Sequence, residues 1–232
     1  MNKTSKSKLI FEGQVLHFAA LAILLGAIYA LRDTPGFRTG SFLGLSTSCW
    51  VVLVIADAVI HQVYVWFCWR VQLHDQALTR WFGEKAFDLY AALFTVLFVL
   101  RPMLVFSLGW SNRGTLDLNA WIGFCVSVIL VLPVIYMMYS IVHFFTFRRA
   151  FGIDHFDPSY RSAPLVHQGI FGWTSNAMYV FGFFSLWIPM FLFQSVTAMI
   201  LAAFSHAYIW VHYFATEKPD MERIYGSKDE EG

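Results

Sequence analysis

The chain has 232 residues, of which 58% are hydrophobic and only 13% are charged. Because a soluble domain usually carries about 25% charged residues, this composition predicts an integral membrane protein. The formal net charge of +1 and the lack of a basic, aromatic-rich stretch argue against a nucleic-acid partner. Neither the three cysteines nor the histidines have metal-ligand spacing, so we predict no metal site.

Six apolar segments are long enough to cross a bilayer, since about 20 helical residues span the hydrocarbon core. In chain order they are 15–31, 43–69, 88–110, 119–147, 177–194 and 195–215. The first has a long apolar core and no small-residue cleavage site after it, so we interpret it as an uncleaved span. The last two meet at Gln194 and Ser195, which predicts a tight helical hairpin. We therefore expect an all-α polytopic membrane protein with about six transmembrane helices.

The charged residues predict how these spans are oriented. With a cytosolic N-terminus, most of the 16 Lys and Arg residues fall on the inside, including Lys6, Arg70, Arg149 and Lys218. Cytosolic segments of membrane proteins carry an excess of Lys and Arg, so this distribution predicts that both termini are cytosolic. It also places the polar stretches on either side of the last hairpin at the cytosolic face.

Two opposite charges lie near the middle of apolar segments, Asp57 in the second and Arg101 in the third. Each costs about 3 kcal/mol or more when alone in hydrocarbon, and antiparallel neighbouring spans bring them to similar depth. A mutual ion pair, with His61 one helical turn from Asp57, is one interpretation. A role in a substrate or proton pathway is the other, and the sequence leaves both open.

Two polar, aromatic-rich stretches border the hairpin, and we call them the first box (169–179) and the second box (216–226). Glycines in the first box permit close approach of the backbone to a neighbour. Ser175 or Asn176 is in position to cap the N-terminus of the fifth span. Pro219 in the second box would stop or kink the helix of the sixth span. We expect the chemistry of this protein at these two boxes.

The boxes contain a set of residues that together resemble one family: Gly169, Phe171, Asn176, Met178, Tyr179, Glu217, Pro219, Ile224, Tyr225 and Gly226. The set resembles the membrane phospholipid and isoprenylcysteine methyltransferase superfamily. In the phosphatidylethanolamine N-methyltransferase branch the boxes read DNPMY and EEPxxxxIY, and here they read SNAMY and EKPDMERIY. The isoprenylcysteine branch has GPYxxxRHPxY as its first box, and this chain lacks that Arg-His-Pro. The resemblance is therefore closest to the phosphatidylethanolamine branch.

The resemblance implies S-adenosylmethionine as methyl donor and a membrane lipid as substrate. It implies cofactor-binding residues in both boxes: Gly169, Phe171, Trp173, Asn176, Tyr179, Glu217 and Tyr225. Aromatic faces attract a sulfonium cation, and a carboxylate would hold the cofactor's ammonium or hydroxyl groups. His212 and Glu217 are the candidate catalytic residues, because an amine acceptor must lose a proton. Residues 1–147 would form a scaffold of four spans, and 148–232 the cofactor-binding region with the hairpin and a cytosolic tail.

The leading prediction is methyl transfer to a membrane lipid amine, either phosphatidylethanolamine or its methylated derivatives. One alternative keeps the cofactor and changes the acceptor to an isoprenylcysteine carboxylate or another small lipophile. A second alternative is a non-catalytic membrane protein that retains the fold. Lys218 supports this alternative, because it reverses the charge of the second Glu in the family's second box.

Overall fold

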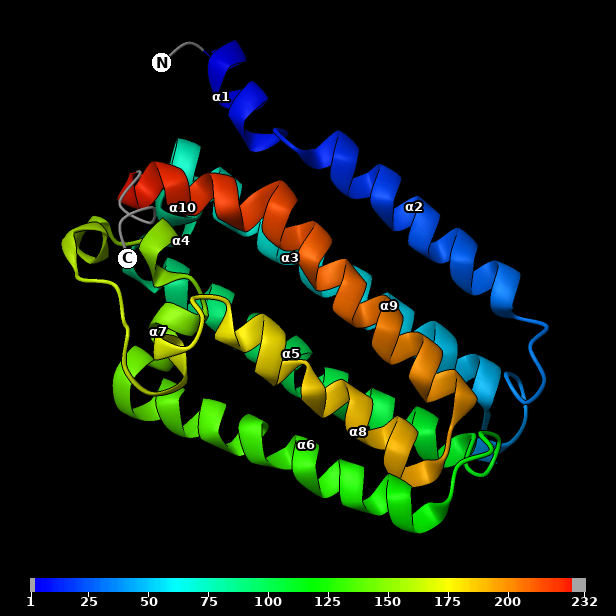
Figure 1. Cartoon of the computed structure of the whole chain (residues 1–232). Helices are drawn as coiled ribbons and strands as arrows, with labels where there is room; N and C mark the ends of the chain where they lie inside the picture. The colour runs from blue at the N-terminus through cyan, green and yellow to red at the C-terminus, as the bar shows by residue number, and fades with distance from the viewer. Residues whose placement is uncertain (1–2, 227–232) are drawn as a thin grey trace.

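The computed structural model describes residues 3–226, so the part of the predicted cytosolic tail after Gly226 lies outside the described residues. The long helices of the described chain, together with α8, run side by side and form one bundle (Figure 1). They are α2 (Gln14–Leu31), α3 (Thr47–Asp75), α5 (Ala86–Ser111), α6 (Ala120–Ser140), α8 (Phe184–Phe193) and α9 (Val196–His212). The described strands are β1 (Ser41–Phe42) and β2 (Leu45–Ser46), which pair as one antiparallel hairpin. The predicted all-α fold is confirmed.

Shorter elements connect these helices, and most of them gather at one end of the bundle (Figure 1). This end carries both α1 (Lys3–Ile10) and α10 (Lys218–Tyr225), and we call it the α10 end. Two more short helices, α4 (Ala77–Phe82) and α7 (Phe147–Ala150), also lie there. Tighter 3-10 segments are η1 (Gly83–Lys85), η3 (Ile153–His155), η4 (Pro158–Ser162) and η5 (Gly169–Gly172). Wider π-helical segments are η2 (Ile141–Phe145), η6 (Met178–Gly182) and η7 (Tyr213–Glu217).

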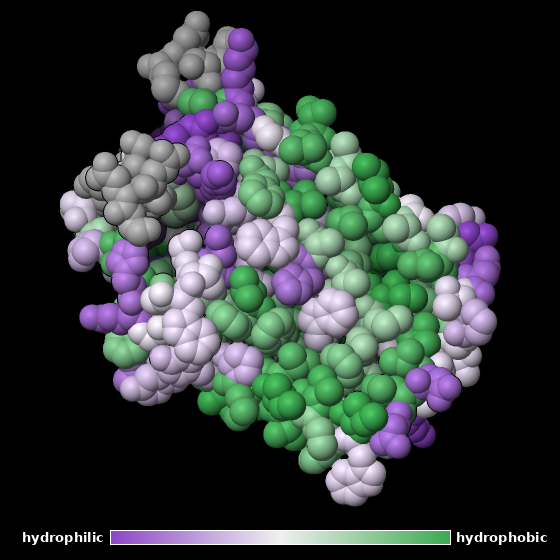
Figure 2. Space-filling model, viewed as in Figure 1, coloured by the Kyte–Doolittle hydropathy of each residue, from purple (hydrophilic) through white to green (hydrophobic). Residues whose placement is uncertain are grey.

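Five helical segments of the described chain are long and apolar enough to cross a membrane: Lys6–Leu31, Thr47–Asp75, Ala77–Ser111, Ala120–Phe145 and Val196–Tyr225. The remaining predicted span, the fifth in chain order, is the shorter apolar helix Met178–Phe193, which is about 24 Å long at 1.5 Å per residue. It ends in α8, which runs alongside the longer helices, so α1 and α10 lie at the same end of the bundle (Figure 1). Figure 2 shows a broad hydrophobic surface across the middle of the bundle and hydrophilic residues at its ends, as in an integral membrane protein.

The short helix α8 packs against α5, α6 and α9. Glycines on its neighbours make this close approach possible. A Cβ atom at Gly109 of α5 would lie 2.8 Å from the Phe193 ring and 2.9 Å from Pro189. A Cβ atom at Gly123 of α6 would likewise overlap the carbonyl of Phe191. Small residues commonly let membrane helices pack this tightly, and here they hold α8, which continues from the first box, between three partners.

The predicted hairpin between α8 and α9 is confirmed. Gln194 adopts a left-handed conformation with φ of 47°, and this conformation reverses the chain direction. Ser195 caps α9, since its Oγ accepts a 3.0 Å hydrogen bond from the N–H of Ala198. The same hydroxyl donates to Oδ1 of Asn112 at 2.9 Å, which ties the turn to the end of α5. The hairpin therefore returns the chain to the α10 end, where both boxes lie.

Asp57 and Arg101 form the ion pair that the sequence suggested. Arg101 Nε donates to Asp57 Oδ2 at 3.2 Å, and both side chains are buried. Arg101 Nη2 also reaches the carbonyl of Ala58 at 3.5 Å. Pairing lowers the cost of two charges inside the hydrocarbon layer, so this contact has a structural role. The other interpretation, a role in a substrate or proton pathway, stays a prediction.

The predicted cap of the fifth span makes no side-chain hydrogen bond within the described chain, although the carbonyl of Asn176 accepts the first helical bond, from the N–H of Val180 at 3.1 Å. The segment η6 begins within the first box, directly after Ala177, and no side chain caps it. One turn earlier, Thr174 Oγ1 accepts a 3.2 Å hydrogen bond from the N–H of Asn176. The backbone carbonyl of Asn176 then accepts from the N–H of Tyr179. A Thr side chain that bonds the backbone two residues ahead forms a turn, and this turn, which ends at Asn176, leads into the helix.

Candidate active site

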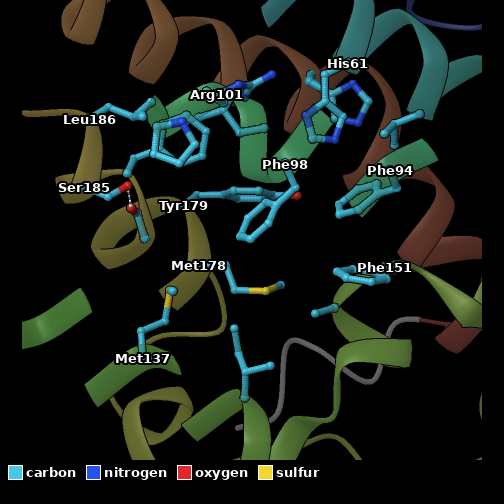
Figure 3. Close-up of a pocket in the computed structure, with 18 of the residues that line it drawn as sticks. His61, Phe94, Phe98, Arg101, Met137, Phe151, Met178, Tyr179, Ser185 and Leu186 are labelled. Carbon is cyan, nitrogen blue, oxygen red and sulfur yellow. Dashed lines mark hydrogen bonds between the residues drawn. The ribbon is translucent and has the colours of Figure 1, made fainter. Parts of the chain in front are cut away.

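A cavity of about 290 Å³ lies inside the bundle toward the α10 end (Figure 3). Along α3 its wall runs from His61 to Trp69, and along α5 it runs from Phe94 to Pro102. Eight residues of helix rise about 12 Å, so the cavity extends about that far along the bundle. The rest of the wall comes from α6, α7, η6, α8 and α9 and is mostly aromatic or methionine: Met137, Met138, Phe147, Phe151, Met178 and Phe183.

Polar side chains border this apolar cavity near both of its ends. Arg101 and His61 lie at the deeper end, and Figure 3 shows them on the side away from Met137 and Phe151. Tyr179 and His212 border the wall contributed by η6 and the end of α9. The cavity is therefore a largely apolar space within the helix bundle with a few hydrogen-bonding groups on its wall.

Tyr179 and Glu217 join the two boxes. Tyr179 belongs to η6 in the first box, and Glu217 ends η7 in the second box, 38 positions later. The Tyr179 hydroxyl donates a hydrogen bond to Glu217 Oε2, and both residues are partly buried. The Tyr179 ring also packs edge-on against the rings of Trp210 and Tyr213, with centroids 6.0 and 5.8 Å away. The hairpin thus brings a carboxylate and an aromatic cluster together beside the cavity.

His212, the other candidate catalytic residue, is the last residue of α9 and is 1% exposed. It borders the cavity, and its ring lies 6.0 Å from the Trp69 ring and 6.1 Å from the His17 ring. Within residues 3–226, neither ring nitrogen has a hydrogen-bond partner. A buried polar group is normally hydrogen-bonded, so an unpaired imidazole facing a cavity is suited to contact a ligand there.

Gly169 and Phe171 brace the first box against α6 and do not line the cavity. Gly169 has φ of 62°, and a Cβ atom there would lie 2.5 Å from Ser140 Oγ. Phe171 is buried and stacks on Phe145, with ring centroids 4.6 Å apart. Ser140 Oγ also accepts a 3.1 Å hydrogen bond from the N–H of Ile170. These contacts give the two predicted residues a structural reason to be glycine and phenylalanine.

Trp173 and Asn176 are not brought into the cavity. Trp173 is 70% exposed, and its ring packs against Tyr136 at 5.8 Å and Phe181 at 5.9 Å. Asn176 is half-buried, and its side-chain amide makes no hydrogen bond to any described residue. The side chain of Asn176 is therefore available to a ligand at the α10 end, whereas Trp173 lies on the outer surface.

Tyr225 links the second box to the connection that follows α7. Its hydroxyl donates to Oδ2 of Asp154 at 2.5 Å, so α10 is attached to η3. Asp154 is buried, and its neighbour His155 stacks on the Trp69 ring at 4.2 Å. Tyr225 is thus part of the polar packing at the α10 end, and it does not line the cavity.

Sequence reasoning missed several residues of this site. It did not single out Trp69, Phe94 or Met137, because apolar residues within a span carry no sign of which ones face a cavity. It also assigned no role to Arg70 and Asp220, which form a fully buried ion pair at 2.8 Å. A basic residue at the inner end of a span and an acidic residue after Pro219 were the available signals for this pair.

Comparison with known proteins agrees with the position of the two boxes. Residues 118–228 match the family model described as phospholipid methyltransferase. The match begins just before α6 and covers the first box, the hairpin and the second box. Neither the curated proteins nor the solved structures contain a match to this chain. Residues 118–228 of this membrane protein are therefore similar to the phospholipid methyltransferase family.

Proposed function

We propose that this protein transfers methyl groups from S-adenosylmethionine to a membrane lipid amine, either phosphatidylethanolamine or its partly methylated derivatives. The observation that carries the proposal is the contact of Tyr179 with Glu217, which joins the two family boxes beside a cavity in the membrane layer. The family match supports methyl transfer to a phospholipid. The donor, the acceptor and the roles of single residues are our proposal.

The residues around Tyr179 fit a cationic methyl donor. Tyr179, Trp210 and Tyr213 form an aromatic cluster, and aromatic faces attract cations such as a sulfonium. The partly buried carboxylate of Glu217 is suited to accept hydrogen bonds from an ammonium or hydroxyl group. When bound, S-adenosylmethionine supplies an electrophilic methyl group. We assign its binding to Tyr179 and Glu217 first, and to Asn176 through its free amide.

The cavity is suited to the acceptor. Its walls are aromatic and methionine side chains, which hold apolar groups and exclude water from the reacting centre. The unpaired imidazole of His212 borders the same space, and one of its nitrogens would accept the proton that an ammonium group must lose. The protein's contribution to an in-line methyl transfer is then alignment of donor and acceptor, exclusion of water and removal of one proton.

We further propose that the α10 end faces the cytosol. Both described ends of the chain lie there, and the excess of Lys and Arg in the inside segments supports this orientation. A water-soluble donor would then approach Tyr179 and Glu217 from the cytosol, while the lipid would approach through the membrane. Such an arrangement keeps the two reactants separate until they meet beside His212.

A second acceptor class has one observation in its favour. The cavity of about 290 Å³ lies at the lower limit for sites that hold drug-sized ligands, and its lining is largely apolar. A small lipophile, such as an isoprenylcysteine with a carboxylate to be methylated, would fill such a space more completely than a lipid headgroup. The absence of Arg-His-Pro from the first box argues against this class, and we rank it second.

The test supplies radiolabelled S-adenosylmethionine to membranes that contain the protein and then separates the lipids. We expect label in mono-, di- or trimethylated phosphatidylethanolamine, and none with a Tyr179→Ala/Glu217→Gln double variant present at equal amount. Label in a small lipophile would support the second acceptor class. Absence of label, together with no saturable binding of S-adenosylhomocysteine by the folded protein, would support a non-catalytic protein that retains the fold.

A further inference from the structure

The second box contains a proline that changes the helix before it. In a regular α-helix the N–H of residue 219 would donate to the carbonyl of Ala215. Pro219 has no N–H, and a proline ring crowds the carbonyl four residues earlier. The helix widens at this point into η7, in which the N–H of Lys218 donates to the carbonyl of Tyr213. The buried carbonyl of Ala215 must therefore find a donor from another part of the chain.

That donor comes from two side chains on the first two spans. Gln14 Nε2 lies 3.5 Å from the carbonyl oxygen of Ala215 and 3.2 Å from Thr216 Oγ1. Arg70 Nη2 lies 3.4 Å from the same carbonyl oxygen and 3.3 Å from that of Thr216. Both donors are buried, Arg70 completely, so water does not replace them readily. The wide turn before Pro219 is thus held from outside its own helix.

The other two guanidinium nitrogens of Arg70, Nε and Nη1, fix the position of the side chain. Its Nε donates to Asp220 at 2.8 Å, and its Nη1 donates to the carbonyl of Leu9 at 2.5 Å. The planar guanidinium has its donors in a fixed fork, so a side chain with all three nitrogens engaged has little freedom. Arg70 contacts the chain at Thr216 and again at Asp220. It therefore holds both sides of Glu217.

We propose that Arg70 and Gln14 are positioning residues, which set the direction of the Glu217 carboxylate toward Tyr179. Within the described chain neither side chain is hydrogen-bonded to Glu217 or Tyr179, and both act through residues 215 and 216 of η7. Both also lie outside the matched residues 118–228, so the N-terminal spans complete the donor site. The expected effect on the methyl donor rests on the proposed function. The hydrogen bonds that Gln14 and Arg70 make to η7 do not depend on it.

The clearest single change is Gln14→Met, which keeps the side-chain volume and removes the donor. The matched control is Gln72→Met, because Gln72 is also buried but bonds Thr79 at 2.7 Å, away from η7. We expect Gln14→Met to raise the KM for S-adenosylmethionine about tenfold with a smaller change in kcat, because a buried carbonyl loses a partner. The control should leave the KM for the donor unchanged, although both variants lower thermal stability.

Hydrogen exchange measured by mass spectrometry gives a second readout that does not depend on activity. We expect backbone amides of residues 213–218 to exchange faster in Gln14→Met than in Gln72→Met. If the first variant does not fold, Gln14→Asn is measured in its place, since it keeps a buried amide but shortens its reach. Exchange and donor KM that match those of Gln72→Met would overturn the positioning role.

Pro219→Ala provides a test of the mechanism. It restores an N–H in reach of the Ala215 carbonyl. Gln14→Met should therefore raise the KM for S-adenosylmethionine by a smaller factor in the Pro219→Ala background than in the unchanged protein. An equal rise in the donor KM in the unchanged protein and in the Pro219→Ala background would contradict the role that we assign to the proline. Failure of the proposed function is distinguishable: the unchanged protein would then not bind S-adenosylhomocysteine, while the exchange difference at residues 213–218 would persist.

Discussion

The two ends of the bundle are held by different kinds of contact. At the opposite end, neutral groups close the structure: the Asn112 amide donates to the carbonyls of Gly36 and Thr39 and accepts from Ser195 and Thr197. At the α10 end, the central contact is the fully buried charge pair of Arg70 and Asp220. The first arrangement joins three loops through a single amide, and the second holds the helix that carries Glu217.

The helices also differ between the two ends in how regular they are. The three π-helical segments η2, η6 and η7 all lie toward the α10 end, whereas α9 begins at the other end with an ordinary Ser195 cap. Wide helical turns are uncommon and frequently occur at functional sites, because they redirect a side chain at a cost in regular hydrogen bonding. The comparison indicates that one end closes the bundle and the other presents reactive groups.

The largest expected effect comes from Glu217→Gln, which should lower activity at the α10 end without lowering the stability of the bundle. The change keeps the size of the side chain and removes the charge that we assign to donor binding, so methyl transfer should fall about a hundredfold. Thermal unfolding in detergent should change little, since the carboxylate is partly exposed. The control is Glu222→Gln, which removes an exposed carboxylate from the same helix. Equal activity in the two variants would remove Glu217 from the site.

An effect of intermediate size is expected from Asn112→Ala, and it should be a loss of stability where Glu217→Gln causes a loss of activity. Five groups would lose their hydrogen bonds to this amide, and those of Ser195 and Thr197 are buried, so the free energy of unfolding should fall by about 2 kcal/mol or more. The affinity of the protein that remains folded for S-adenosylhomocysteine should not change. Thermal unfolding followed by calorimetric titration measures both quantities. A loss of affinity at constant stability would show that the two ends are not separable.

The smallest effect is expected from Trp173→Ala. The side chain is 70% exposed and lies on the outer surface, away from Tyr179 and Glu217. An exposed aromatic near the end of a membrane bundle is suited to the lipid–water interface, so we expect donor affinity to stay within about twofold. Phe171→Ala is the comparison, because it empties a buried position in the same box. A large drop in affinity for Trp173→Ala would restore it as a cofactor-binding residue.

Much of this arrangement is readable from the amino-acid sequence. Apolar length is enough to predict the spans, and the adjacent Gln194 and Ser195 are enough to predict the hairpin. Asp57 and Arg101 could be paired in advance, because a charge in hydrocarbon needs an opposite charge at similar depth. The pattern of the boxes singled out Tyr179 and Glu217, which the structure joins by a hydrogen bond. These predictions depend on local composition and on the physics of the bilayer.

Other features depend on how the helices are rotated against one another. A span that is apolar on every side does not reveal which face meets its neighbours, so Trp69 and Phe94 could not be assigned to the cavity beforehand. For the same reason Trp173 was expected near the cofactor and lies on the outside. The pair of Arg70 and Asp220 joins residues 150 positions apart, and packing of α3 against α9, which leads through η7 into α10, brings them together. Spans and boxes thus follow from local sequence. The cavity, and the contacts that Arg70 and Gln14 make on either side of Glu217, follow from long-range packing.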